Sequence, residues 1–205
     1  MDDAAALLPT LGHVLDGVDG VSGAAYFGSM ARGDFDDLSD IDLIVRCSET
    51  VADAVAASIH STLDVCLYRP FTRGRAPSGR YWFTRAHPFA RLDVSFHREV
   101  SYDRIAAEGD EYVHPPLRPL AISGGGRHAP VGQESPNRWS QQSFDFAGAL
   151  RDYQEAVKAR VRGRPPKRSV EETVRRIEPF ELTVHATEWD LYLRSAEIAR
   201  LRGIA

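Results

Sequence analysis

Apolar positions in the first third of the chain switch between helical and strand periodicity. Leucines and valines recur every three to four residues over 3–17, which predicts an amphipathic helix. The stretch GVSGAAYFGS (20–29) predicts a short strand that ends in a tight turn. The β-branched segment IDLIVRC (41–47) predicts a second strand.

The middle of the chain continues with one helix and further strands. SETVADAVAASIHSTL (48–63) predicts a helix that Ser48 or Thr50 caps. A Gly/Pro turn is expected at RGRAPSG (73–79), and strands are predicted at LDVCLYR (63–69), GRYWFTR (79–85) and ARLDVSFHR (90–98). A βαβ beginning with added antiparallel strands indicates an α+β fold, a mixed β-sheet backed by helices.

From His114 the pattern changes to a segment dense in Pro, Gly and Ser, which sustains neither a helix nor a central strand. Two helical regions follow, the first stopped by GRPP (163–166) and the second interrupted near Pro179. We therefore predict a catalytic domain over 1–115, a linker or long loop over 116–140, and a helical C-terminal region over 141–205.

The composition, 43% hydrophobic and 26% charged, is that of a globular protein. No apolar run reaches the roughly 18 residues of a membrane span, and acidic residues at the start argue against a secretion signal. Cys47 and Cys66 fall in predicted strands, which fits buried thiols in a reducing cytoplasm; a disulfide between neighbouring strands is the alternative.

Charge is unevenly distributed along the chain. Residues 1–60 contain eleven acidic residues against two arginines, whereas the remainder is net basic, and the total is −4. This asymmetry is expected if an acidic, metal-binding edge faces a basic surface that receives an anionic substrate. Two solvated faces of opposite charge would give the same distribution.

The candidate chemistry centres on acidic residues at two predicted strands. Asp40 and Asp42 are two residues apart and project from the same face, where their repulsion costs free energy unless a cation or proton compensates. Mg²⁺ would accept both carboxylates. Asp93 becomes a third carboxylate if its strand lies beside that of Asp40, and three carboxylates can hold two metals about 4 Å apart.

The turn before these acids supplies a complementary feature. At Gly28 the backbone can approach a phosphate closely, and Ser29 adds a hydroxyl and amide hydrogens. The SGGGRH segment (123–128) is a weaker phosphate-binding candidate, because no strand precedes it and no helix follows.

The ordered set of a strand, GS, D-x-D on the next strand and a later lone Asp resembles the polymerase-beta-like nucleotidyltransferase superfamily. GSMARGDFDDLSDIDL (28–43) is especially similar to minimal bacterial nucleotidyltransferases and to the adenylyltransferases that confer antibiotic resistance by inactivating aminoglycosides and lincosamides. The resemblance implies a nucleotidyltransferase core in which Gly28 and Ser29 contact the terminal phosphates of ATP or another NTP. Asp40 and Asp42 would ligate Mg²⁺, and Asp93 would complete a site for two ions.

Other polar residues have more than one interpretation. Arg32 could brace the triphosphate or form a surface ion pair on a helix. His97 shares the predicted face of Asp93, yet a structural role is favoured, and the acidic residues of 34–37 are interpreted as a solvated turn. Most of the arginines between 69 and 91 are expected to be solvated, with one or two facing the substrate.

Three functions follow from the resemblance and the residues. The first is a cytoplasmic, Mg²⁺-dependent enzyme that moves AMP from ATP to a hydroxyl of a small, aminoglycoside-like acceptor, with release of pyrophosphate. The second is an antitoxin-type nucleotidyltransferase that modifies a protein or RNA. The third is a non-catalytic nucleotide-binding module, against which the three clustered carboxylates argue. No membrane partner is expected, and the sequence leaves the oligomeric state open.

Overall fold

The computed structural model describes residues 4–109, 111, 113–114, 116–122 and 139–204. The chain forms two compact units, Met1–Val65 with Pro70–Pro136, and Cys66–Arg69 with Asn137–Ala205. The division at 115 and 140 stays a prediction. Of the predicted linker, 123–138 lies outside the described residues, and so does the SGGGRH candidate at 123–128.

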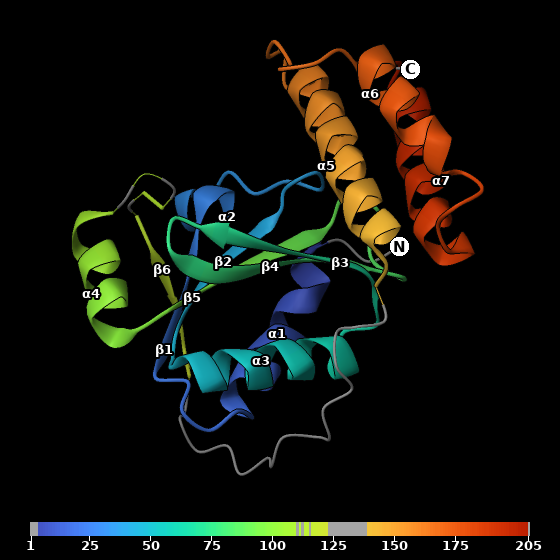
Figure 1. Ribbon diagram of the computed structural model, residues 1–205. Helices are drawn as coiled ribbons and strands as arrows, with labels where there is room; N and C mark the ends of the chain where they lie inside the picture. The colour runs from blue at the N-terminus through green and yellow to red at the C-terminus, as the bar shows by residue number, and fades with distance from the viewer. Residues whose placement is uncertain (1–3, 110, 112, 115, 123–138, 205) are drawn as a thin grey trace. The chain divides into compact units, whose positions relative to one another are not determined.

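The first unit contains most of a six-stranded sheet and the helices that flank it (Figure 1). A short 3-10 turn, η1 (Ala4–Leu7), leads into the predicted first helix. The elements then follow in the order α1 (Leu8–Asp16), β1 (Gly23–Phe27), α2 (Gly28–Arg32), β2 (Ile41–Arg46), α3 (Glu49–Thr62), β3 (Val65–Arg73), β4 (Ala76–Phe83), β5 (Arg91–His97), α4 (Glu99–Glu108) and β6 (Arg118–Leu120).

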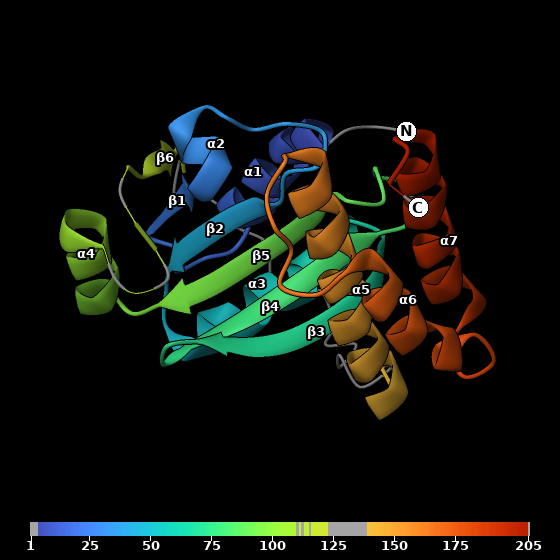
Figure 2. The same cartoon turned by 90° about the horizontal axis from the view of Figure 1, so that it is seen from above.

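The sheet is mixed, as predicted, and its strand order is β3-β4-β5-β2-β1-β6. β2 and β5 run parallel, whereas β1 pairs antiparallel with β2 and β6, and β4 pairs antiparallel with β5. The two parallel strands are separated by β3 and β4 in sequence but are neighbours in space (Figure 2). This non-local pairing brings together the two segments that carry the predicted carboxylates.

Apolar side chains cover both faces of the central strands. α1 and α3 lie on one face of the sheet (Figure 1). On the other face, Ala25, Phe27 and Ile44 pack with Ile105 of α4 and with Val113. β2 is therefore apolar on both faces except at the end that carries Asp42, and this keeps the strand fixed in the sheet.

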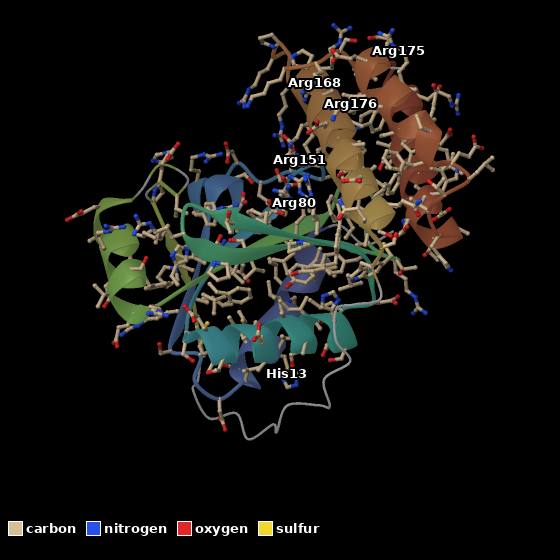
Figure 3. All side chains as sticks on the ribbon, viewed as in Figure 1. His13, Arg80, Arg151, Arg168, Arg175 and Arg176 are labelled. Atoms are coloured by element: carbon tan, nitrogen blue, oxygen red, sulfur yellow. The ribbon has the colours of Figure 1, made fainter. Side chains whose placement is uncertain are left out.

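The second unit contains the predicted C-terminal helices, α5 (Gln141–Val161), α6 (Val170–Ile177) and α7 (Ala186–Leu201), with a 3-10 turn, η3 (Glu178–Phe180), at the predicted interruption. Tyr153 of α5 meets Tyr192 of α7 edge-on, with ring centroids 5.4 Å apart. Asp152 accepts hydrogen bonds from the guanidinium groups of Arg151, Arg168 and Arg176, all labelled in Figure 3. Aromatic packing and one shared carboxylate thus join these helices.

Several details differ from the sequence-based expectations. The turn expected over 73–79 is tighter, because β3 continues to Arg73 and β4 begins at Ala76, with Gly74 at φ +60° between them. α4 and β6 were not predicted, since only Ile105 is buried in α4 and β6 has three residues.

Cys47 and Cys66 are both buried thiols. No helix in the described part of the chain has the length and hydropathy needed to cross a membrane.

Candidate functional site

The structure brings Asp42 and Asp93 together on neighbouring strands. They are direct partners in the parallel register of β2 and β5. Phe27 on β1 is the partner of Asp42, and Arg80 on β4 is the partner of Asp93. Because directly paired residues project from the same face, these four side chains form one row across the sheet. Arg80 lies on the opposite face from His13 of α1 (Figure 3).

Asp93 is held by a bidentate ion pair with Arg80. Arg80 Nε donates to Oδ1 at 2.7 Å and Arg80 Nη2 donates to Oδ2 at 2.5 Å, and both side chains are at least nine-tenths buried. Burial opposes ionisation of Asp93, but the guanidinium groups of Arg80, Arg91 and Arg73 outweigh it and lower its pKa to about 2. Asp93 is therefore ionised at neutral pH, and both of its oxygens accept hydrogen bonds.

Asp42 has the opposite electrostatic character. The guanidinium of Arg73 lies beside it, with Nη2 3.6 Å from Asp42 Oδ1, beyond hydrogen-bonding distance. Burial, followed by the charges of Asp93 and Asp40, raises the pKa of Asp42 to about 7. A carboxyl group in this position is protonated or bound to a cation more readily than an ordinary aspartate.

Asp40 precedes β2 and pairs with Arg91, the first residue of β5. The Arg91 side chain is buried, and its Nε also lies 3.5 Å from Asp93 Oδ1. Arg91 thus joins the first and third predicted carboxylates. All three aspartates belong to one cluster, as the sequence predicted, and three arginines accompany them.

The turn that follows β1 lies directly against Asp42. Gly28 has φ +64°, and a Cβ atom built there would come 2.7 Å from Asp42 Oδ2. Glycine is therefore required both for the backbone conformation and for the close approach. Ser29 follows in the first turn of α2. The structure thus sets the backbone of the Gly-Ser turn beside the carboxylates.

Arg32 ends α2 and forms an exposed ion pair with Asp34, with Nη2 3.2 Å from Oδ1. This is the surface pairing that was the alternative interpretation of Arg32, and its role toward a triphosphate stays a prediction. His97 is buried, and its Nδ1 lies 3.3 Å from Ser101 Oγ. Its position fits the structural role that was favoured for it.

The fit of a metal ion depends on which carboxylate oxygens remain available. Among the described residues, no group of three or more His, Cys, Asp or Glu side chains is arranged to hold a metal. Arg80 donates hydrogen bonds to both oxygens of Asp93, whereas the guanidinium of Arg73 stays 3.6 Å from Asp42, too far for a hydrogen bond. The raised pKa of Asp42 reflects burial and then the negative charges of Asp93 and Asp40, and a hard cation would offset both effects. One divalent ion between Asp40 and Asp42 therefore fits this donor set, and the two-ion site stays a prediction.

The expectation that most of the middle arginines are solvated was wrong for those that contact the carboxylates. Arg80 and Arg91 are buried, and Arg73 is nine-tenths buried with its guanidinium 4.6 Å from the centroid of the Phe27 ring. Arg91 could have been identified from the sequence, because it stands two residues before Asp93 and shares its face. Arg80 could not, because its place opposite Asp93 depends on the register between β4 and β5.

Part of the chain is similar to known proteins. A family model described as a nucleotidyltransferase domain matches residues 15–74, which include the Gly-Ser turn and Asp42 but end before Asp93. Among curated proteins, none matches the sequence. Eight chains of solved structures match. One comes from a structure described as that of a cytoplasmic RNA terminal U-transferase, with 20% identity and a TM-score of 0.35. The match covers 51% of this chain and 33% of that chain, so the likeness concerns only part of each.

The two paired aspartates should respond oppositely to neutralisation in metal-free buffer. The folded-state pKa of Asp42, about 7, lies above the ordinary value, so its charge destabilises the fold progressively from about pH 4 to pH 7. Asp42→Asn should then raise the free energy of unfolding at pH 8 by roughly 1 to 4 kcal/mol and have little effect at pH 4. Asp93→Asn should lower it at pH 8 by about 3 kcal/mol, because Arg80 loses its charged partner.

Chemical denaturation at pH 4 and pH 8, with EDTA present, measures both changes. Asp37→Asn, at an exposed position of the turn before β2, serves as the control and should change little at either pH. Equal destabilisation by Asp42→Asn and Asp93→Asn would contradict the electrostatic difference between them.

Gly28→Ala tests the close approach of the turn to Asp42. Gly33 also has a positive φ, +82°, but a Cβ atom there would meet nothing within 4 Å. Gly33→Ala should therefore show only the backbone cost of about 1 kcal/mol, whereas Gly28→Ala should be destabilised by about 1–2 kcal/mol more. Urea unfolding of the two variants measures the difference, and equal losses would mean that Asp42 moves aside at no cost.

Proposed function

We propose that the chain is a nucleotidyltransferase of the polymerase-beta-like superfamily and that it transfers a nucleoside monophosphate to a hydroxyl group; the match of residues 15–74 to a nucleotidyltransferase domain supports this. The proposal depends above all on the register that sets Asp42 beside Asp93. The proposed donor is ATP or another NTP with Mg²⁺. We propose a cytoplasmic location, because the two cysteines are free thiols, as is usual in a reducing compartment.

Each part of the cluster has a proposed role. Gly28 and Ser29 contact the terminal phosphates through backbone amides and the hydroxyl. Asp40 and Asp42 would hold a divalent cation, which would supply Lewis-acid polarisation of the α-phosphate. Asp93 joins the ligand set when Arg80 releases it, and this would complete the predicted two-ion site.

The transfer itself is an in-line displacement. The acceptor hydroxyl oxygen forms a bond to the α-phosphorus, the bond to the bridging oxygen breaks, and pyrophosphate leaves with both electrons of that bond. The proton of the hydroxyl passes to a carboxylate of the cluster or to water. Arg73, Arg80 and Arg91 surround the carboxylates with positive charge that can attract and brace the triphosphate.

The proposed acceptor is a small, hydroxylated, aminoglycoside-like molecule, with a protein or RNA target as the alternative. A second candidate function is a nucleotide-binding module without catalysis. It is favoured by the pairing of Asp93 with Arg80 and of Asp40 with Arg91, because internal arginines can balance clustered carboxylates without a metal.

Pyrophosphate release separates the two candidates. The protein is incubated with each NTP and Mg²⁺ in the presence of an acceptor library of aminoglycosides, other polyols, RNA and proteins. A nucleotidyltransferase should release pyrophosphate and give an acceptor heavier by one nucleoside monophosphate in mass spectrometry. Asp42→Asn should lower the rate by about 100-fold or more, whereas Asp37→Asn should retain it. ATP binding with no nucleotidylated product for any acceptor would favour the binding module.

Metal stoichiometry tests the role of Arg80 without relying on activity. Wild-type protein should bind one Mn²⁺ through Asp40 and Asp42, whereas Arg80→Met should bind a second ion because both Asp93 oxygens become available. Electron paramagnetic resonance of free Mn²⁺ during titration counts the bound ions. Arg85→Met is the matched control, since Arg85 is exposed and its ion pair is with Asp64. An unchanged stoichiometry in folded Arg80→Met would contradict the idea that Arg80 withholds Asp93.

A further inference from the structure

A cavity of about 550 Å³ lies at the opposite end of the parallel strands from the Asp40 side chain. Its lining includes Cys47, just after β2, and His97, the last residue of β5. The two strands are followed by helices that leave toward different faces. α3 lies under the sheet (Figure 1), whereas Ile105 of α4 packs with Ile44 on the face of Asp42. A crevice at the carboxyl ends of parallel strands, where their connections diverge, is where open α/β sheets bind ligands.

The cavity carries an excess of positive charge. Four arginines line it, Arg73, Arg75, Arg98 and Arg104, against two glutamates, Glu49 and Glu111. One arginine and one glutamate of the set, Arg98 and Glu49, pair with each other. The remaining charged residues of the lining are three arginines and one glutamate, and one of these arginines, Arg73, also lies near Asp42 and Asp93. An anionic ligand would therefore gain attraction on entering the cavity.

Two helix N-termini meet at the same cavity and add to this attraction. The N-cap of α3, Ser48, and the N-cap of α4, Arg98, both line it. Because the N-terminal end of a helix carries partial positive charge and amide donors, both helices favour an anion here. Ser101, one turn into α4, contributes a hydroxyl group to the lining.

Arg73, which lines the cavity, has an unused hydrogen-bond donor. Its side chain is nine-tenths buried, and its Nη1 has no hydrogen-bond partner among the described atoms. The acidic oxygens nearest to its Nη2, on Asp42 and Asp93, lie 3.6 and 3.9 Å away, too far for hydrogen bonds. A buried guanidinium with an unused donor is costly unless a ligand pairs with it.

We propose that this cavity binds the phosphoryl group of a phosphate monoester. A phosphate dianion matches the charge excess and can accept hydrogen bonds from guanidinium groups that approach from β3, the following turn and α4. The volume accommodates a whole phosphorylated sugar or nucleotide end. The site is separate from the Gly-Ser turn, shares only Arg73 with the carboxylate cluster, and does not depend on the transfer reaction.

Isothermal titration calorimetry of the full chain tests the proposal. The probes are inorganic phosphate, ribose 5-phosphate, and an RNA hexamer with and without a 5′-phosphate. Arg75→Ala and Arg104→Ala, both at exposed positions, should each weaken binding of the phosphorylated probes about tenfold. Arg85→Ala, at an exposed arginine outside the cavity, should leave it unchanged. Ser29→Ala alters the turn proposed to hold triphosphate, so a loss of binding in that variant would place the phosphate there and overturn the proposal.

The outcomes separate the sources of the phosphate and the two sites. Preference for ribose 5-phosphate would identify a small phosphorylated ligand, whereas binding only of the 5′-phosphorylated hexamer would identify an RNA end. Equal binding of both hexamers, no binding of any phosphorylated probe, or undiminished binding by Arg75→Ala and Arg104→Ala would overturn the proposal. Thermal unfolding confirms that each variant is folded, and Arg104→Gln replaces any alanine variant that is not.

Discussion

The parallel register of β2 and β5 is the constraint on which the rest of the site depends. It sets two aspartates side by side in a largely buried row, where burial and mutual repulsion oppose the ionisation of both. The protein compensates them unequally. Arg80 binds Asp93 with a complete bidentate pair, whereas Asp42 retains an elevated affinity for protons. The cluster therefore has one carboxylate that is fixed in charge and one that is receptive to a cation.

The apolar pattern of β2 enforces this arrangement. Ile41, Leu43 and Val45 are completely buried, and Ile44 is buried on the opposite face. A slip by one residue would turn Asp42 toward the apolar face of the sheet that α1 and α3 cover, so other registers are disfavoured. The chemistry of the site is thus fixed by the hydrophobic residues around it, and Gly28 allows the preceding turn to follow the same strand closely.

Much of this could be predicted from local sequence. The central strands, the carboxylates and the C-terminal helices follow from periodicity, because each pattern acts over a few neighbouring residues. The role of Arg80 follows instead from a pairing between β4 and β5, which local patterns do not specify. α4 escaped prediction because one buried residue, Ile105, gives almost no helical periodicity. The ion pair between Arg80 and Asp93 could therefore not be predicted from local sequence. The proximity of Arg91 could have been, because it shares the strand and face of Asp93.

The position of Arg73 has a consequence for cooperativity. Arg73 lies beside Asp42 and also lines the cavity. An anion in the cavity and the carboxylate of Asp42 would therefore compete for interaction with the same guanidinium. Occupation of the cavity would withdraw that charge from Asp42 and strengthen its hold on a divalent ion. By thermodynamic reciprocity the ion would tighten the anion to the same degree. Two ligands of opposite sign would then promote each other's binding through a single side chain.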